Sequence, residues 1–323
     1  MAVSGQVIVV GSSNYDRTTY VDSLPRPGET VTAQETRESI GGKGANQSVA
    51  AATVGVQVVF LSALGHDTEG TVLRHELGER GVELVDLLPG TSQRTGTAAI
   101  TVDEQGENVI VVSPGANGAH LPEVTERCLA KVGERVGGDA VVVSQAEVPV
   151  DTIAQASAWA GRHDLRFVLN IAPYTDLPAE VVASANPLVV NETEALALLS
   201  SLGRAVPGGA EDADPVELCR SLAGCAVSVV VTLGARGAAC LVGNRVEVSE
   251  PPAVSRVVDT TGAGDAFVGA LAALLAGGRS LPEGVRLATE LAALTVTEAG
   301  AATSYRVWTA DVLDHVLGAN TPR

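Results

Sequence analysis

The stretch Val7-Ile8-Val9-Val10, which leads into Gly11-Ser12-Ser13-Asn14, decides the fold class of this chain. Its four residues are all apolar and β-branched, and no polar residue alternates with them. A strand of this kind is buried on both faces, whereas a half-exposed strand alternates apolar and polar residues. The run therefore predicts a strand inside a parallel sheet that helices cover on both sides.

Runs of the same kind recur along the chain. Further buried strands are predicted at 58–62, 140–144, 167–170, 188–191 and 229–233. Helical patterns separate them at 45–54, 69–80, 152–161, 193–202 and 215–222, and the chain is nearly all helical after residue 265. This alternation predicts an α/β fold, a doubly wound and mainly parallel sheet flanked by helices. The Gly-, Pro- and acid-rich stretch 203–215 is predicted to be a loop.

Two segments interrupt this alternation. Residues 18–40 carry prolines and a polar alternation, and residues 97–112 have β-branched runs on both sides of the turn residues Asp103-Glu104-Gln105-Gly106. We expect both to form a small second sheet, a lid over a cleft, inserted as 17–40 and 95–112 into a core domain of 1–16, 41–94 and 113–323. An extension of the main sheet at its edge is the alternative.

Composition narrows the class of protein. The chain has 323 residues, 46% of them hydrophobic and 18% charged, which is enough apolar material for a large core. A net charge of -17 disfavours partners such as nucleic acids or anionic membranes. The longest nearly apolar stretch, 266–276, is too short for the ~20 residues that cross a bilayer. The four cysteines form no CxxC pair, so we expect reduced thiols and a cytoplasmic protein.

Polar residues follow the first strand directly. Ser13 occupies the place of the second glycine of a dinucleotide-binding GxGxxG motif, so that motif is absent here. Asn14 and Asp16 instead leave the carboxyl end of the strand, where ligands bind in open α/β sheets. An amide and a carboxylate two residues apart suit the vicinal hydroxyls of a polyol. An Asx turn is the alternative.

A second motif is Gly41-Gly42-Lys43-Gly44-Ala45-Asn46. Its glycines allow backbone to approach a ligand closely at the start of a helix. Lys43 can reach anionic oxygen, and Asn46 lies one turn further along the same face. A glycine-rich helix entry with a solvated Lys43 is the alternative.

The most informative motif is Asp259-Thr260-Thr261-Gly262-Ala263-Gly264-Asp265-Ala266-Phe267, which opens a helix. A Gly-Ala-Gly turn at a helix start directs unpaired N–H groups and the positive end of the helix dipole at one point. Such an anion hole suits the charge on a phosphoryl group in transfer, while Asp265 can accept a proton from an attacking hydroxyl. Asp265 as an ordinary N-cap is the alternative.

Three weaker motifs follow other predicted strands. Asn191 and Glu194 could hold magnesium-bound water beside a polyphosphate, or simply form a helix-capping pair. Thr232, Gly234 and Gly237 could line a nucleotide or turn a hairpin, and Glu147 could accept a hydroxyl. Together these residues predict phosphoryl transfer to a hydroxylated small molecule.

The sequence resembles the ribokinase-like (PfkB) family of carbohydrate kinases over nearly its whole length, from Val7 to about Trp308. The resemblance rests on motifs in the family's order, namely Pro27-Gly28-Glu29-Thr30, Gly41-Gly42-Lys43-Gly44-Ala45-Asn46-Gln47, Gly115-Ala116-Asn117, Asn191-Glu192-Thr193-Glu194 and 259–267. It implies transfer of the γ-phosphoryl group of ATP to the 5-hydroxyl of ribose. It also implies a Mg²⁺ requirement and a lid that pairs two subunits into a homodimer.

The resemblance also implies a role for each matching residue. Asp265 would be the general base, and Gly262, Ala263 and Gly264 the anion hole. The sugar would contact Asp265 together with Asn14, Asp16, Gly42, Lys43, Asn46 and Glu147. ATP would contact Asn191, Glu194, Thr232, Gly234, Gly237, Gly264 and Thr289, the last at a position where relatives often carry Asn or His.

An activating potassium ion is also implied beside the anion hole. The matching positions are Asp259, Thr261, Thr295, Glu298, Gly300 and Ser304. Glu298 stands where such kinases often carry a basic residue. The ion is therefore expected if residue 298 contributes only its carbonyl, and not if its side chain takes part.

Competing functions make different predictions. A sibling kinase would act on 2-deoxyribose, another sugar or a nucleoside, although the 3% aromatic content disfavours nucleoside stacking. A non-catalytic sugar sensor would keep the fold without needing Asp265 as a proton acceptor. A dehydrogenase would need the glycine fingerprint that is missing after the first strand.

Overall fold

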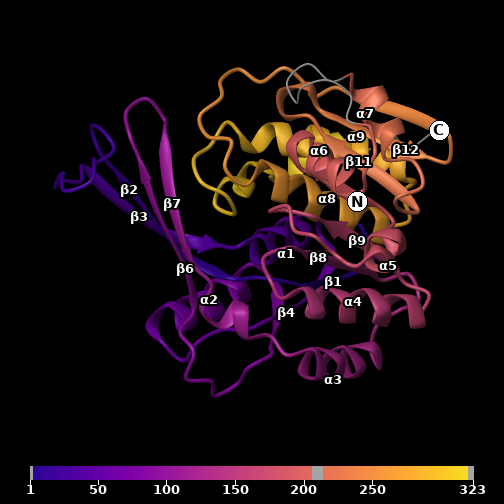
Figure 1. Ribbon diagram of the computed structural model, residues 1–323, viewed down its shortest axis with the longest axis horizontal. Helices are drawn as coiled ribbons and strands as arrows, with labels where there is room; N and C mark the ends of the chain where they lie inside the picture. The colour runs from indigo at the N-terminus through magenta and orange to yellow at the C-terminus, as the bar shows by residue number, and fades with distance from the viewer. Residues whose placement is uncertain (1–2, 206–213, 319–323) are drawn as a thin grey trace.

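A computed structural model describes residues 3–205 and 214–318. Within these ranges the larger sheet has nine strands (Figure 1). Their order is β13 (Arg245–Ser249), β12 (Ala238–Val242), β11 (Ser228–Thr232), β10 (Leu188–Asn191), β9 (Arg166–Asn170), β8 (Val141–Gln145), β1 (Gln6–Val10), β4 (Gln57–Ser62) and β5 (Val82–Asp86). All neighbours pair in parallel except β11–β12 and β12–β13. The predicted α/β sheet is confirmed. Of the predicted loop 203–215, residues 206–213 lie outside the described ranges.

Helices cover both faces of this sheet and divide the core into two apolar clusters. One cluster lies under α1 (Lys43–Val54), α2 (Thr68–Glu79), α8 (Ala263–Ala276), α9 (Leu281–Thr295) and α10 (Ala310–Gly318). The other lies under α3 (Pro122–Gly133), α4 (Val150–Arg162), α5 (Ala179–Ser184), α6 (Glu192–Ser201) and α7 (Pro215–Ser221). Figure 1 shows α8 and α4 on opposite sides of the strands.

The chain order of the strands reverses at β1. From β1 the chain proceeds through β4 to β5 on one side, and then returns to β8 and builds outward through β9, β10 and β11 on the other. Neighbouring connections then leave in opposite directions, and this opens a crevice at the carboxyl ends of β1 and β8.

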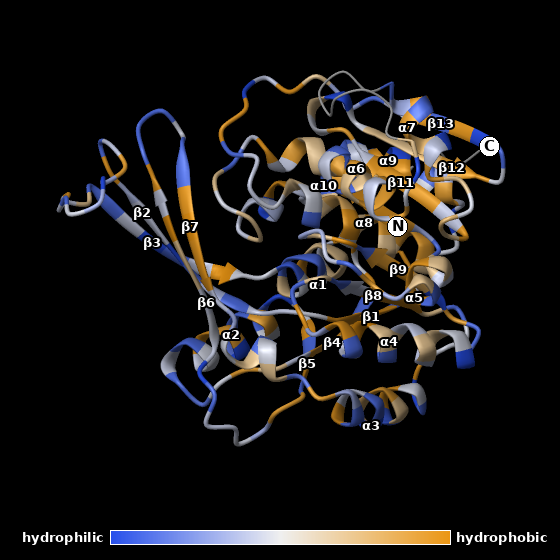
Figure 2. Ribbon diagram, in the orientation of Figure 1, coloured by the Kyte–Doolittle hydropathy of each residue, from blue (hydrophilic) through white to orange (hydrophobic). Residues whose placement is uncertain are grey.

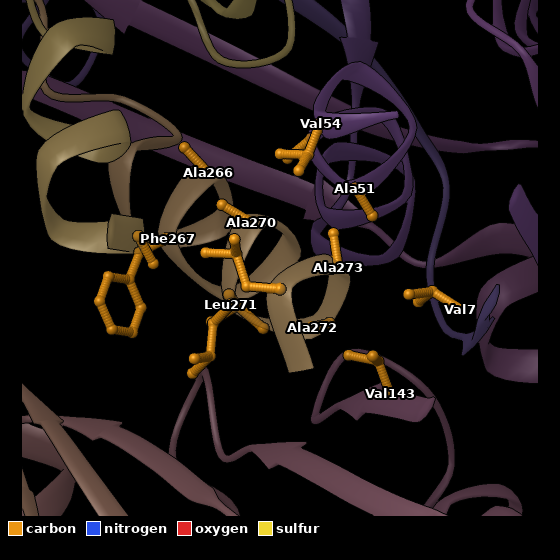
Figure 3. Close-up of a cluster of buried hydrophobic side chains, with 14 of the residues drawn as sticks. Val7, Ala51, Val54, Val143, Ala266, Phe267, Ala270, Leu271, Ala272 and Ala273 are labelled. Atoms are coloured by element: carbon orange, nitrogen blue, oxygen red, sulfur yellow. The ribbon is translucent and has the colours of Figure 1, made fainter. Parts of the chain in front are cut away.

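Helices α1 and α8 pack closely beside this crevice, as Figure 3 shows for Ala51, Ala270 and Ala273. Their contact depends on small residues. A Cβ at Gly269 would lie 2.4 Å from the backbone oxygen of Gln47 and 2.6 Å from the Cβ of Ala50. The missing side chain lets the first turn of α8 lie against α1, and this brings functional side chains of the two helices together.

A second sheet extends away from the core (Figure 1). It has four strands within the described residues, in the order β3 (Glu35–Gly41), β2 (Asn14–Tyr20), β6 (Gly96–Val102) and β7 (Asn108–Ser113). The separate small sheet and its β6–β7 hairpin are confirmed. Strand β2 begins at Asn14, so two predicted ligand residues, Asn14 and Asp16, belong to this sheet. The exact limits of a lid domain stay a prediction.

Short 3₁₀ helices complete the chain at η1 (Gly115–Ala119), η2 (Gly234–Arg236) and η3 (Ser304–Val307). No helix in the described ranges has the length and apolar character needed to cross a bilayer.

Candidate active site

Two cavities meet at the carboxyl ends of β10 and β11. The larger, of about 590 Å³, extends from β11 and η2 to α8 and α9, and the smaller, of about 130 Å³, lies between α1, β9, β10 and α8. Asn191, Thr232 and Gly264 line both. The first turn of α8 therefore lies where the two spaces join.

Asp265 occupies this turn and is 7% exposed. Its Oδ2 accepts a hydrogen bond from Nδ2 of Asn46 at 3.0 Å, and its Oδ1 accepts one from Nε2 of Gln47 at 3.0 Å. Both donors belong to α1. The carboxylate lines the smaller cavity and does not cap its own helix, so the N-cap alternative is wrong.

The turn before Asp265 leaves backbone donors unpaired. Gly262 is the N-cap of α8 with φ 75°, and a Cβ there would lie 2.6 Å from Cα of Ala301, so only glycine fits. The N–H of Ala263 donates to the carbonyl of Thr260 at 3.2 Å. Within 3–205 and 214–318, the N–H groups of Gly264 and Asp265 have no protein acceptor. Of the predicted Gly262–Gly264 set, only the N–H of Ala263 has a protein acceptor in the described ranges, and the anion-hole role of the set stays a prediction.

Asp16 lies against the glycine pair at the end of β3. A Cβ on Gly41 would lie 1.9 Å from Oδ2 of Asp16, so the carboxylate rests on bare backbone. Its Oδ1 is buried without a hydrogen-bond partner. Burial, followed by the nearby charges of Glu147 and Asp265, raises the pKa of Asp16 to about 7. A buried acceptor with no protein donor is suited to a hydroxyl of a ligand.

Asn14 is oriented by a side chain from η1. Its Oδ1 accepts a hydrogen bond from Nδ2 of Asn117 at 2.8 Å. Asn117 also accepts from the N–H of Ser13 and donates to the carbonyl of Ser13, both at 2.9 Å. The NH₂ group of Asn14 is thereby left available to a ligand.

Lys43 and Glu147 join the cluster from α1 and from the loop after β8. Glu147 Oε2 accepts hydrogen bonds from Oγ of Ser12 at 2.5 Å and from the backbone N–H of Lys43 at 2.9 Å. The negative charges of Asp265, Glu147 and Glu194 raise the pKa of Lys43, against burial, which lowers it. Lys43 lines the smaller cavity with Asp265, so its ammonium is not a freely solvated surface group.

The residues predicted to contact ATP gather around the larger cavity. All but Glu194 line it, namely Asn191, Thr232, Gly234, Gly237, Gly264 and Thr289. Glu194 lines the smaller cavity instead. The rest of the wall is largely apolar and includes Val254, Val257, Phe267 and Val296. This composition suits a planar aromatic base with a polar tail.

The capping interpretation of Asn191 and Glu194 is confirmed. Asn191 Oδ1 accepts from the N–H of Glu194, and Glu194 Oε2 accepts from the N–H of Asn191, both at 2.8 Å. This capping box fixes both side chains at the cavity walls. Burial raises the pKa of Glu194. The hairpin interpretation after Thr232 is confirmed too, since β11 pairs with β12 in antiparallel register.

The residues predicted for potassium lie in two segments joined by a hydrogen bond from Gly300 to Asp259. One is the loop before α8 with Asp259 and Thr261, and the other runs from the end of α9 at Thr295 to the start of η3 at Ser304. The carboxylate of Asp259 accepts the N–H of Thr261 and the N–H of Gly300, each at 2.8 Å. The hydroxyls of Thr295 and Ser304 donate to the carbonyls of Ala292 and Ala301. The side chain of Glu298 pairs with Arg306 and so does not turn toward Asp259.

Four polar side chains at the site were not predicted. Ser12 holds Glu147, Asn117 holds Asn14, and Gln47 and Asn170 belong to the surroundings of Asp265. Asn170 carried a usable signal, because it ends a predicted strand. Gln47 carried none beyond its place in a glycine-rich motif, since its partners are distant in sequence.

Comparison with known proteins gives a consistent result. The family model described as pfkB family carbohydrate kinase matches residues 4–308. The ribokinase of Bacillus subtilis is 35% identical over 295 residues, 91% of this chain and 94% of the relative. A deoxyribokinase of Salmonella typhi is 31% identical over 307 residues, with 93% and 95% covered.

One relative is longer. The chain spans 54% of the bifunctional ribokinase/ribose-5-phosphate isomerase A of Fructilactobacillus sanfranciscensis, with 33% identity over 306 residues, 93% of this chain.

Solved structures agree with this result. The crystal structure of ribokinase from Thermotoga maritima has a TM-score of 0.83 at 29% identity and covers 97% of this chain and 99% of its own. The ribokinase of Arabidopsis thaliana, solved with ribose and ATP, has a TM-score of 0.78 at 28% identity with the same coverage. The matching family model spans residues 4–308, almost all of the chain, so this protein belongs to the pfkB family of carbohydrate kinases.

Proposed function

We propose that this protein is a ribokinase that transfers the γ-phosphoryl group of ATP to the 5-hydroxyl of D-ribose and releases D-ribose 5-phosphate and ADP. The observation that carries the proposal is the position of Asp265. Its carboxylate lines the smaller cavity next to Gly264, which lines both cavities, and it lies beside the unpaired N–H groups of Gly264 and Asp265. Curated ribokinases at 31–35% identity over most of the chain support the choice of ribose.

The geometry suggests how the residues divide the work. ATP occupies the larger cavity, and the sugar lies against Asp16, Asn14 and Glu147 with its 5-hydroxyl directed at Asp265, which lines the smaller cavity. The 5-hydroxyl oxygen forms a bond to the γ-phosphorus while its proton passes to Asp265. The bond from the γ-phosphorus to the bridging oxygen breaks, and its electron pair leaves on ADP.

Charge that develops on the phosphoryl oxygens needs fixed donors. The N–H groups of Gly264 and Asp265 and the ammonium of Lys43 can supply them without reorganising during the reaction. Holding base, hydroxyl and phosphoryl group in one enclosed place lowers the entropic part of the barrier. A non-catalytic sugar sensor would need neither a proton acceptor nor fixed donors for the charge of a phosphoryl group.

An ATP-dependent kinase needs a divalent cation, and we assign Mg²⁺ to this role. Hard cations prefer oxygen ligands and commonly bind through one or two carboxylates, water and the substrate's phosphates. Glu194 fits, because the capping box uses its Oε2 and no protein donor in the described ranges takes its Oε1. Mg²⁺ would neutralise phosphate charge there.

We also assign K⁺ as the activating cation between the loop of Asp259 and the segment from Thr295 to Ser304. Carbonyl and carboxylate oxygens are the ligands such an ion requires. The side chain of Glu298 is held by Arg306, which leaves position 298 to contribute only its carbonyl, as a potassium site would need.

Strand β7 supports a homodimer formed through the lid. It is an edge strand of the small sheet, and Val109, Ile110, Val111 and Val112 are all exposed. Edge strands with exposed apolar residues on both faces are templates for pairing. A cytoplasmic location is supported by the four cysteines, all of them free thiols.

A coupled ADP-release assay tests the proposal. Ribose, 2-deoxyribose, fructose and adenosine are compared at equal concentration, each with K⁺ and with Na⁺. We expect ribose to be preferred, with deoxyribose losing about 10- to 100-fold in kcat/KM if one charge-assisted hydrogen bond is lost. Equal turnover of the two pentoses would favour the sibling kinase, and no ADP with any sugar would favour the sensor.

A further inference from the structure

Asp265 is held by a chain of amide side chains in which Gln47 and Gln145 line neither cavity, whereas Asn170 lines the smaller one. Gln47 on α1 donates from Nε2 both to Oδ1 of Asp265 at 3.0 Å and to Oδ1 of Asn170 at 3.1 Å. Gln145, the last residue of β8, donates from Nε2 to Oε1 of Gln47 at 2.7 Å. Asn170, the last residue of β9, donates from Nδ2 to the backbone carbonyl of Val189 at 3.1 Å.

The direction of donation in this chain is fixed at two places. A backbone carbonyl only accepts, so Val189 forces Asn170 to present its oxygen to Gln47. An ionised carboxylate also only accepts, so Asp265 needs a donor from the same side. Asn170 and Asp265 therefore both require the NH₂ group of Gln47. The oxygen of Gln47 accepts the hydrogen bond from Nε2 of Gln145. A flipped amide at residue 47 would put oxygen against oxygen at two contacts.

The location of Gln47 separates it from the ligand. It is 0% exposed and lines neither cavity. Asn46, the residue before it, also lines neither cavity, but it is 6% exposed and keeps a buried Oδ1 without a partner. Asn46 therefore still has an acceptor for a ligand, whereas the amide of Gln47 is occupied by Asp265, Asn170 and Gln145. Gln145 and Asn170 are register partners on adjacent strands, so the sheet itself sets the spacing of the chain.

We infer that Gln47, oriented by Gln145 and Asn170, is a positioning residue for phosphoryl transfer, which keeps the Asp265 carboxylate aimed at the acceptor hydroxyl. This inference rests on the proposed function, since it assumes that Asp265 is the general base. A hydrogen bond to the charged form of an acid favours that form. A buried amide that can only donate gives this preference without adding charge to the site.

The test replaces Gln47 by Leu and measures single-turnover phosphorylation of ribose, so that product release does not mask the chemical step. We expect the rate to fall about 10- to 100-fold, the usual effect of losing a hydrogen bond to a charged group. The affinity for ribose, measured by calorimetry, should change less than about threefold. The acid limb of the rate–pH profile should also move to higher pH, because the carboxylate has lost a hydrogen-bond donor.

Ser48→Ala is the matched control. Ser48 is one residue further along α1, is also 0% exposed, and bonds only to the carbonyl of Gly44 in its own helix. The Ser48→Ala variant loses a buried hydrogen bond that does not involve Asp265. Its single-turnover rate and its rate–pH profile should therefore match those of the wild type.

Gln145→Met tests the same series of hydrogen-bonded amides at Gln145, and it replaces Gln47→Leu as the test if that variant does not fold. The substitution removes the donor to Oε1 of Gln47, which leaves the amide of Gln47 free to rotate, so the rate of phosphoryl transfer should fall about two- to fivefold. In the double variant the Gln145 substitution should have no further effect, because the residue it orients is gone. Independent, multiplying effects would contradict the inference.

The inference is overturned if Gln47→Leu keeps the rate and pH profile of Ser48→Ala, or if it weakens ribose binding as much as it slows transfer. Its failure can be told apart from failure of the proposed function. A wild-type protein that does not phosphorylate ribose refutes the function, whereas an active wild type with an unaffected Gln47→Leu refutes only the positioning role.

Discussion

The tetrapeptide Val-Ile-Val-Val occurs twice in this chain, and its two copies have opposite surroundings. Residues 7–10 form β1 and are each 0% exposed, whereas residues 109–112 lie in β7 and are 53–62% exposed. Figure 2 shows the apolar β7 on the projecting sheet, while β1 is enclosed among strands and helices. Identical side chains with identical β propensity thus serve as core in one place and as surface in the other.

Neighbours make the difference. Strand β1 pairs with β4 and β8, and helices cover both of its faces. Strand β7 pairs only with β6, and no described helix covers it. The exposed copy therefore keeps its apolar faces and its open edge for another chain, whereas the buried copy provides the rigid base on which the site is built.

The largest expected effect is the difference in stability when the same Val→Glu substitution is made in each copy of the tetrapeptide. Val9→Glu buries a charge without a partner inside the sheet, and we expect no folded protein. Val111→Glu at the equivalent place of β7 should leave the thermal midpoint of the monomer within about 2 °C, because surface changes are small. It should convert the proposed dimer to monomer in light scattering.

A Val111→Glu protein that stays dimeric would remove β7 from the proposed interface. A Val9→Glu protein that folds normally would contradict the statement that residues 7–10 are core whereas residues 109–112 are surface. Val111→Thr serves as the mild control, since it keeps the shape of the side chain without adding charge.

The next largest expected effect is on catalysis, at a residue of the buried core domain. Asp265→Asn should lower kcat about 10²- to 10⁴-fold, because an amide cannot accept the proton of the attacking hydroxyl. Ribose affinity, measured by calorimetry, should stay nearly unchanged, since the shape of the side chain is kept. Activity within tenfold of the wild type would exclude Asp265 as the general base.

Asp16 lies at the junction of the two regions, because β2 begins beside the core and continues into the small sheet. Asp16→Ala removes the buried acceptor that rests on Gly41. Ribose affinity should fall about 10- to 100-fold, the effect of losing charge-assisted hydrogen bonds to hydroxyls. An unchanged affinity would place Asp16 outside the sugar site.

The smallest effect is a pH dependence at the same residue. The pKa of Asp16, raised mainly by burial to about 7, means that the folded protein holds a proton the unfolded chain releases near pH 4. Stability from this group is therefore present below pH 4 and is lost as pH rises toward 7. Asp16→Asn should raise the thermal midpoint at pH 8 by about 3 °C or more.

Ribose binding should change in the opposite sense, since the ionised carboxylate is the better acceptor. Affinity of the wild type should rise between pH 6 and pH 8 and level off above, whereas Asp16→Asn should show a flat profile. Parallel profiles for the two proteins would show that another group sets the pH dependence.

Much of this arrangement was predictable from local sequence. The buried strands, the glycine turn before Asp265 and the capping pair at Asn191 are local features, and each appeared where the sequence indicated. Strands β5 and β13 were not predicted, because they are the two edge strands of the large sheet and mix polar and apolar residues. Helix α3 was not predicted either, although its apolar residues recur at helical spacing and Leu129 and Val132 are buried.

By itself, the sequence determined the α/β class, the position of Asp265 in the first turn of a helix, and the polar residues at strand ends, since all of these follow from periodicity and backbone chemistry. Only the tertiary structure decided which backbone donors stay free, that Gln47 holds Asp265, and that one Val-Ile-Val-Val is core and the other surface. Those outcomes depend on contacts between residues up to 219 positions apart, which no local pattern records.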